Sequence, residues 1–198
     1  THKTRQMVVG CGWGGIGVVD LEAESRCLIG PRTVSIIITA RPQDDRFIDR
    51  AYQSAIEQGR EVVVVWDSCH IPDRYRDKPL QISANYGDVS KARYAGFQAA
   101  SGSIVLYLEA DDILPPSFVA DATNELVNAT KEDDRVAGVY PEVARIDEET
   151  TSRSTEKLAC LWGKPIFECD NVAVAFALVW AHALRVAWHQ GGGARIQK

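Results

Sequence analysis

Three carboxylates follow an apolar segment near the middle of the chain. Residues 104–108 (IVLYL) run directly into Glu109, Asp111 and Asp112, and two prolines come shortly afterwards. In an extended segment residues i and i+2 point the same way, so the carboxylates of Glu109 and Asp111 can converge on one cation. Mg²⁺ and Mn²⁺ favour oxygen ligands, and Mg²⁺ typically binds one or two carboxylates together with substrate phosphates. From these residues alone, a helix cap formed by Asp111 or Asp112 is an equal alternative.

A glycine-rich pattern near the N-terminus suggests a different chemistry. Residues 10–15 (GCGWGG) fit G-x-G-x-x-G, which cradles a pyrophosphate when it links a strand to a helix. Residues 7–10 make a poor strand, Trp13 is bulky, and the segment that follows has no clean helical face. An irregular or hairpin lead-in is therefore the favoured interpretation, and a dinucleotide-dependent oxidoreductase is the weakest of our hypotheses.

Strand and helix patterns alternate through the centre of the chain. Continuous apolar runs predict buried strands at residues 34–39 (VSIIIT), 61–66 (EVVVVW) and 104–108, with further strands at 80–83 and 136–140. Amphipathic or small-residue patterns predict helices over 47–59, 90–100 and 117–128. Such alternation is typical of an open α/β sheet. Ligands of these sheets sit beyond the carboxyl ends of the strands, where Thr39, Asp67 and the three acids fall.

Composition narrows the class of protein. The chain has 198 residues, a net charge of −5 and no basic stripe, so we expect no nucleic-acid partner. Its five cysteines are widely spaced without a C-x-x-C pair, which disfavours a disulfide framework or a zinc site and favours a reducing compartment. The longest apolar run, residues 172–181, is too short to cross a bilayer, and the N-terminus lacks a signal-peptide core. We therefore expect a cytoplasmic protein without a transmembrane segment.

The order of the central motifs resembles the inverting family 2 glycosyltransferases of the GT-A fold. The resemblance covers residues 33–145 and rests on VSIIIT, EVVVVWDS, the NYG…ARYAG segment and EADDILPP. It implies a Rossmann-like open mixed sheet, mostly parallel, with helices on both faces. It also implies a nucleotide-diphosphate sugar donor, with a UDP-sugar expected, and a Mn²⁺ or Mg²⁺ ion. The acceptor would be a saccharide or another hydroxyl compound, and its hydroxyl would attack the donor sugar with inversion.

The resemblance assigns roles to individual residues. Thr39 would lie near the base and ribose, Asp67 would accept a hydrogen bond from the base, and Arg93 would face the nucleotide. Glu109 and Asp111 would occupy the two acidic places of the D-x-D motif, with Asp111 as the direct metal ligand and Glu109 beside it.

Asp112 would hold a water or the donor sugar, or simply cap the following helix. Five residues, at four places of the usual family pattern, depart from it and put the donor preference in question: Trp66, the pair Arg41 and Pro42, Tyr94, and Glu109 itself.

The resemblance divides the chain into a glycine-rich lead-in (residues 1–32), a nucleotide-sugar-binding core (33–145) and an acceptor-side segment (146–198). Residues 147–157 are polar and are predicted to form a surface loop or a flap. In the family the catalytic base, an Asp or Glu, follows a Gly-Gly turn, but residues 194–198 contain no carboxylate. An inverting transfer needs a base near the acceptor hydroxyl, so we expect it beyond Lys198 in a longer chain. The alternative is a nucleotide-sugar-binding module without efficient turnover.

Overall fold

The fold is known from a computed structural model of the chain. It describes residues 5–8, 32–58, 61–132, 136–140, 143–146, 153–156, 178–182, 184 and 185. The glycine-rich pattern at residues 10–15 and the segment 186–198 lie outside the described residues.

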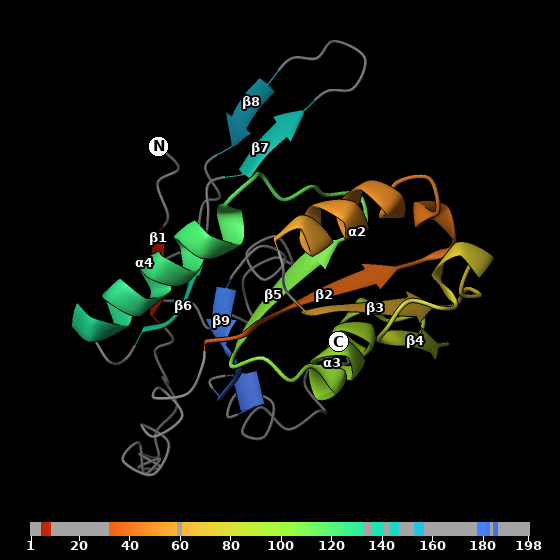
Figure 1. Ribbon diagram of the computed structural model, residues 1–198, viewed down its shortest axis with the longest axis horizontal. Coiled ribbons are helices and arrows are strands. Elements are labelled where there is room, and N and C mark those ends of the chain that lie inside the picture. The colour runs from red at the N-terminus through yellow and green to blue at the C-terminus, as the bar shows by residue number, and fades with distance from the viewer. Residues whose placement is uncertain are drawn as a thin grey trace.

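Seven of the described strands form one sheet, in the order β1-β6-β9-β5-β2-β3-β4 (Figure 1). Its parallel part consists of β5 (Ile104–Glu109), β2 (Val34–Ala40), β3 (Glu61–Asp67) and β4 (Gln81–Ala84). The remaining strands are β9 (Leu178–Trp180), which is antiparallel to both β5 and β6, then β6 (Val136–Tyr140) and β1 (Arg5–Val8), which is antiparallel to β6. The sheet is thus mixed and mostly parallel, as the sequence predicts.

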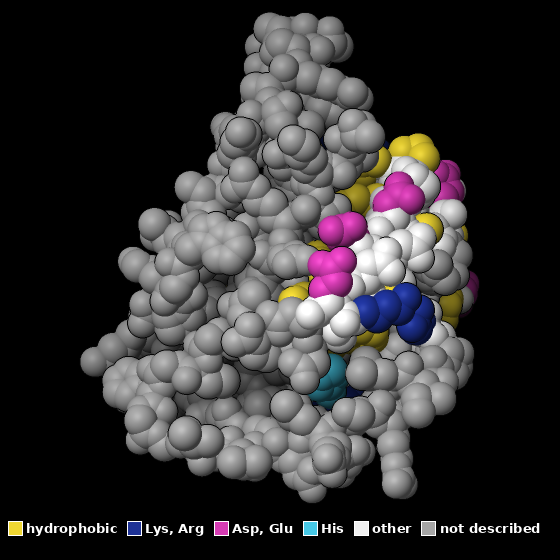
Figure 2. All heavy atoms as spheres, turned by 90° about the vertical axis from the view of Figure 1, so that its left-hand side faces the viewer, with side chains coloured by type: hydrophobic (Ala, Val, Ile, Leu, Met, Phe, Trp, Pro, Cys, Tyr) yellow, Lys and Arg dark blue, Asp and Glu magenta, His cyan; other side chains and the backbone are white. Residues whose placement is uncertain are grey.

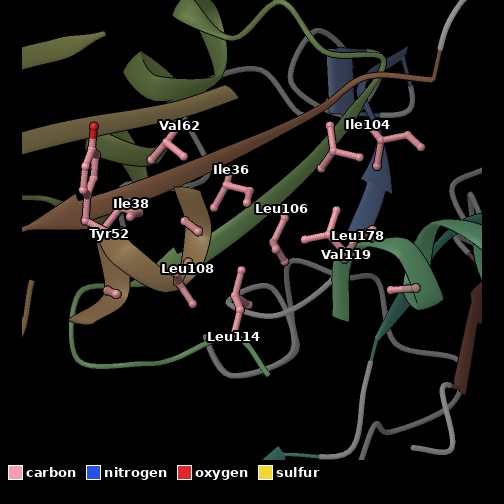
Figure 3. Packing of buried hydrophobic residues seen from close by; sticks show 14 of the residues in the cluster. Ile36, Ile38, Tyr52, Val62, Ile104, Leu106, Leu108, Leu114, Val119 and Leu178 are labelled. Carbon is pink, nitrogen blue, oxygen red and sulfur yellow. The ribbon is translucent and has the colours of Figure 1, made fainter. Parts of the chain in front are cut away.

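Helices cover both faces of this sheet. The helices α2 (Ile48–Glu57) and α4 (Phe118–Glu132) bury their apolar residues in one core cluster, and α3 (Val89–Ala99) buries its own in a second cluster on the other face. Figure 3 shows the first cluster, in which Ile36 and Ile38 of β2 face α2 and α4. The intervening Ile37 points into the second cluster. This explains the unbroken β-branched run of β2, because a strand covered on both faces has no solvent side to make polar.

The helix α3 lies very close to the sheet. Asp88 caps its N-terminus by accepting hydrogen bonds from the backbone N–H groups of Ser90 (2.8 Å) and Lys91 (3.2 Å). Further along, a Cβ atom at Gly96 would stand only 2.4 Å from Cγ2 of Ile37. Glycine is therefore required at this position to let the helix backbone approach β2.

Two segments differ from the sequence-based expectation. Residues 153–156, predicted as part of a loop, form the strand β8 (Arg153–Glu156), which pairs antiparallel with β7 (Val143–Ile146). This hairpin is separate from the main sheet and projects away from it at the top of Figure 1. Near the N-terminus, β1 ends the sheet, although residues 7–10, which overlap its second half, make a poor strand pattern. In both cases the strand is specified by its pairing partner rather than by its own residue pattern.

The surface agrees with the acidic composition. Figure 2 shows Asp and Glu side chains gathered over the described part of one face, with basic side chains beside them. Within the described residues, no helix is both long enough and apolar enough to cross a membrane.

A cluster of hydrogen-bonded polar residues links β2, β3 and the segment before β5 at the edge of the sheet opposite the carboxyl ends of the strands. The Glu61 carboxylate accepts hydrogen bonds from Ser35 Oγ (2.6 Å), Ser101 Oγ (2.7 Å) and the Ser101 N–H (2.8 Å). Ser35 Oγ in turn accepts from the Gly102 N–H at 2.8 Å. Burial acts to raise the pKa of Glu61, but these hydrogen bonds outweigh it and hold the pKa below its usual value.

Replacing this carboxylate should destabilise the fold in a pH-dependent way. We expect Glu61→Gln to lower the free energy of unfolding at neutral pH by roughly 1–2 kcal/mol, because the amide presents N–H groups to the Ser35 and Ser101 donors. Since the folded pKa lies below the ordinary glutamate value of 4.5, the carboxylate stabilises the fold above that pH and loses its effect in acid. Urea denaturation at pH 7 and at about pH 3 should therefore show the difference shrinking. The exposed Glu57→Gln serves as the control, and an equal effect there would contradict this account.

Candidate functional site

The strand order places one edge of the sheet at a switch point. Within the parallel part of the sheet, β3 and β4 follow β2 along the chain and lie on one side of it. The next strand, β5, lies on the other side of β2. In open α/β sheets the crevice at such a reversal, outside the carboxyl ends of the strands, is where ligands bind. Here β2 and β5 pair in parallel register up to Thr39 and Glu109, and Thr39 Oγ1 donates to Glu109 Oε2 at 3.4 Å.

Arg93 reaches this same point from α3. Its side chain is 8% exposed, and its Nη2 forms an ion pair with Glu109 Oε1. The guanidinium carbon lies 5.8 Å from the centre of the Tyr107 ring. Within the described part of the chain, Arg93 Nε finds no hydrogen-bond partner. Three residues predicted from the sequence, Thr39, Arg93 and Glu109, are thus brought into one connected cluster.

The two aspartates that follow are held differently. Asp111 is exposed, whereas Asp112 is half-buried. The backbone N–H of Asp112 donates a hydrogen bond to the Glu109 carbonyl at 3.1 Å. Burial, together with the negative charges of Asp111 and Glu109, raises the pKa of Asp112 to about 7. The helix α4 begins only at Phe118, so neither aspartate occupies its N-cap position. The helix-cap interpretation of these two residues is therefore wrong.

The carboxylates after β5 can be compared with the ligands that a divalent cation requires. Among the residues that the structure describes, no three Asp, Glu, His or Cys side chains converge closely enough to hold a metal ion alone. Both oxygens of Glu109 are engaged, one by Arg93 and one by Thr39. Asp111 and Asp112 remain, and Mg²⁺ commonly binds through one or two carboxylates with substrate phosphates and water in the other positions. The residues present therefore fit a cation that binds together with a phosphorylated substrate.

Asp67 has a structural role that the sequence did not reveal. It is 2% exposed, and its carboxylate accepts hydrogen bonds from the backbone N–H groups of Tyr86 (2.6 Å), Gly87 (3.2 Å) and Asp88 (3.2 Å). Gly87 adopts a φ of +59°, a left-handed conformation that suits glycine. Asp67 thereby holds the turn that leads into α3. The glycine of the N-x-G pattern was the sequence signal of this turn, but nothing in it pointed to Asp67.

A groove lies on the β3 side of β2, away from β5, at the carboxyl ends of β2 and β3. Its volume is about 520 Å³, within the usual range for small-molecule sites. Three segments line it: residues 41–43 after β2, residues 67 and 68 at the end of β3, and residues 87–89 at the start of α3. Sequence reasoning placed Asp67 here but noted Arg41 only as a departure from the family pattern and passed over Gln43.

The fold defines a Rossmann-like α/β protein with a polar cluster at the switch point of its sheet. The sequence model of glycosyl transferase family 2 matches residues 35–173, which is 139 of the 198 residues. The chain therefore belongs to glycosyltransferase family 2, and the predicted resemblance and enzyme class are confirmed.

Similarity to individual proteins is more distant. The structure of S. aureus TarS 1-349 is 13% identical, with a TM-score of 0.48, and the similarity covers 78% of this chain and 48% of that one. For the same protein in complex with UDP-GlcNAc the values are 22% and 0.39, over 48% and 31%. For M. tuberculosis glucosyl-3-phosphoglycerate synthase they are 21% and 0.37, over 58% and 46%.

The matched region spans less than half the length of each of these solved chains. No curated protein sequence matches the chain. The family assignment rests on the family model and the strand order, not on these three similarities.

The Arg93–Glu109 pair should be measurable as a coupled unit. We expect Arg93→Met to lower the free energy of unfolding by roughly 1–3 kcal/mol, because it leaves a partly buried carboxylate without its cation. Adding Glu109→Gln should recover part of this loss, with a coupling energy of roughly 0.5–3 kcal/mol in a double-mutant cycle from urea denaturation. As a control, Arg76→Met removes an exposed pair with Asp73 and should change stability by less than about 0.5 kcal/mol. Additive single-variant effects would argue against the pair.

Proposed function

We propose that this chain transfers a sugar from a nucleotide-diphosphate donor, expected to be UDP-linked, to an acceptor hydroxyl with inversion and with the help of a divalent cation. The observation that carries the proposal is the cluster at the β2–β5 switch point. There Glu109 pairs with the buried Arg93, Asp111 and Asp112 follow Glu109 within three residues, and the groove opens on the β3 side of β2.

The two parts of the site suit the two parts of such a donor. The acids follow β5, whereas the groove lies at the ends of β2 and β3. Neighbouring strands are about 4.8 Å apart, so β5 and β3 are separated by roughly 10 Å across β2. A nucleoside diphosphate can bridge this span with its phosphates at the acids and its base in the groove. The ribose would then cross the end of β2 near Thr39.

Each site residue has a proposed part in holding the donor. Asp111 would ligate a Mg²⁺ or Mn²⁺ ion, with Asp112 beside it. Glu109 would reach the ion only by giving up its bonds to Arg93 or Thr39, so its first task is to orient the Arg93 guanidinium toward the nucleotide. When bound, the cation would neutralise the diphosphate and stabilise it as a leaving group.

Inversion requires that the acceptor hydroxyl attack the anomeric carbon in one displacement, with a base taking its proton. No described residue is assigned this role, and a base beyond Lys198 stays a prediction. For that reason a nucleotide-sugar-binding module without turnover is the second candidate. The oxidoreductase hypothesis is disfavoured because β1, which precedes the glycine-rich pattern, is antiparallel to its neighbour at the sheet edge. A dinucleotide fingerprint instead follows a strand that opens a parallel βαβ unit.

Metal-dependent donor binding tests the proposal directly. Calorimetric titration with UDP should show binding with Mn²⁺ that weakens strongly when a chelator replaces the metal. Asp111→Ala should weaken the Mn²⁺-supported binding on the order of 10–100-fold, because it removes a ligand of the cation. Asp77→Ala, which removes an exposed acid before β4, should leave binding unchanged. UDP binding that is indifferent to both metal and Asp111 would contradict the proposed site.

Turnover separates the two candidate functions. UDP-GlcNAc, the ligand of the TarS complex, supplies a first donor to test. We expect a transferase to release UDP from its donor, and NMR of the glycoside product should show the anomeric configuration opposite to that of the donor. Retention of configuration would contradict inversion. A protein that binds donors tightly but releases no UDP from any donor and acceptor pair would be the binding module.

A further inference from the structure

The segment between β5 and α4 carries the two aspartates, and a side chain of α2 holds its far end. Leu114 of this segment is 5% exposed and packs in the first core cluster (Figure 3). Pro115 and Pro116 follow it and have no backbone N–H, so the Leu114 N–H is the last backbone donor before both prolines. This N–H donates to Ser54 Oγ at 3.1 Å, in a buried contact between residues sixty positions apart.

Ser54 meets this N–H as an acceptor. Its hydroxyl proton is donated to the Ala51 carbonyl at 2.9 Å within α2, so the lone pairs of the oxygen are left for Leu114. Ser54 is 7% exposed, and Ala51 and Ala55 beside it are fully buried in the first core cluster. The acceptor is therefore presented by the packed face of α2, and the position of Leu114 follows the position of this helix.

Gln58 binds the same segment one turn further along, at the C-cap of α2. Its Nε2 donates to the Pro115 carbonyl at 3.2 Å, and its Oε1 accepts from the Val119 N–H at 3.3 Å. Val119 is the second residue of α4, where backbone N–H groups have no partner within their own helix. Residues four apart on a helix share a face, so Ser54 and Gln58 hold the segment together, on both sides of the prolines.

These contacts define the far end of the stretch that contains Asp111 and Asp112. Its near end is Glu109, which is placed by the pairing of β5 with β2. Within the described part of the chain, no hydrogen bond to the carboxylate of either aspartate is found, so their backbone sets where the two groups lie. A cation site needs its ligands held to within about 0.5 Å by supporting residues. Here the support lies at the two ends of the stretch, and α2 supplies the far one.

We propose that Ser54 and Gln58 are positioning residues for the divalent cation. By fixing the backbone at Leu114 and Pro115, they keep Asp111 and Asp112 at the place proposed for the cation and the donor diphosphate. This inference rests on the proposed function and adds to it two residues that touch neither the cation nor the donor. The helix α2 then has a part in metal binding as well as covering the sheet.

Calorimetric titration with UDP, in Mn²⁺ and in chelator, tests the role of Ser54. Ser54→Ala deletes the acceptor of the Leu114 N–H without adding bulk. It should weaken UDP binding on the order of 10-fold or more in Mn²⁺, as loss of a supporting residue does at metal sites, and leave the weaker binding in chelator unchanged. Amide hydrogen exchange of the metal-free protein should be faster at Leu114 than in the wild type. Gln58→Ala, at a less buried position, should show the same dependence on Mn²⁺.

Thr130→Val is the matched control. Thr130 Oγ1 donates to the Leu126 carbonyl at 2.7 Å within α4 and accepts from Trp180 Nε1 at 3.0 Å, which are the same two kinds of bond that Ser54 makes. It lies roughly 18 Å along the helix axis from Phe118, far from the acids. Thr130→Val should lower the free energy of unfolding by an amount similar to that of Ser54→Ala and leave Mn²⁺-supported UDP binding unchanged. Thermal melting of all variants checks that they are folded at the temperature of the titrations.

Three results would overturn the inference. Wild-type affinity for UDP in Mn²⁺ in both Ser54→Ala and Gln58→Ala would mean that α2 does not position the acids. Equal weakening in Mn²⁺ and in chelator, or an equal loss in Thr130→Val, would mean that the variants act through the stability of the fold alone. Each of these leaves metal-dependent binding by the wild-type chain intact, so it rejects the positioning role and not the proposed function. Binding by the wild type that is indifferent to the metal would reject both.

Discussion

The parallel pairing of β2 with β5 is the constraint on which the rest of this molecule depends. The two strands run in register from Val34 and Ile104 to Thr39 and Glu109, with both faces buried. Because the register is fixed over six residue pairs, the two strands end at the same level. That coincidence places Thr39 and Glu109 side by side at the switch point. A one-residue slip would turn Glu109 to the other face of the sheet and away from Arg93.

Some charged side chains of the site are neutralised by a partner, whereas others are not. On the α3 face, Glu109 and Arg93 neutralise each other in a largely water-excluded setting. Two residues further on, Asp111 lies exposed, and the half-buried Asp112 has a raised pKa because of burial and its acidic neighbours. The site therefore has a neutral, rigid part built into the sheet and an anionic part on the turn beyond it. That division matches a ligand whose nucleoside is held by fixed groups and whose phosphates arrive with a counter-ion.

The sequence predicted the interior of the fold better than its edges. Runs such as residues 34–39 and 61–66 specify strands by themselves, because a β-branched segment buried on both faces has few other conformations available. The strands β1, β7 and β8 were not predicted, because such short strands gain their hydrogen bonds from a partner that local periodicity does not reveal.

The same distinction holds in the site. Strand-end residues such as Thr39 and Glu109 were predicted from motif order. The engagement of Asp67 by a turn about twenty residues away, and the approach of Arg41 to that turn, depend on tertiary packing. Motif order also placed Arg93 and Glu109 near the nucleotide but gave no sign that they bind each other.

The absence of a side chain at Gly96 of α3 has a consequence beyond packing. Gly96 lies one turn after Arg93, and residues three apart on a helix share a face, so both point toward the sheet. The depth at which the helix sits on Ile37 thus sets how far the guanidinium extends over the end of β5. The charge geometry of the proposed nucleotide site is in this sense adjusted one turn further along the helix, by the absence of a side chain. In this chain Gly96 is a spacing element of the site as well as a packing residue, although it would touch no substrate.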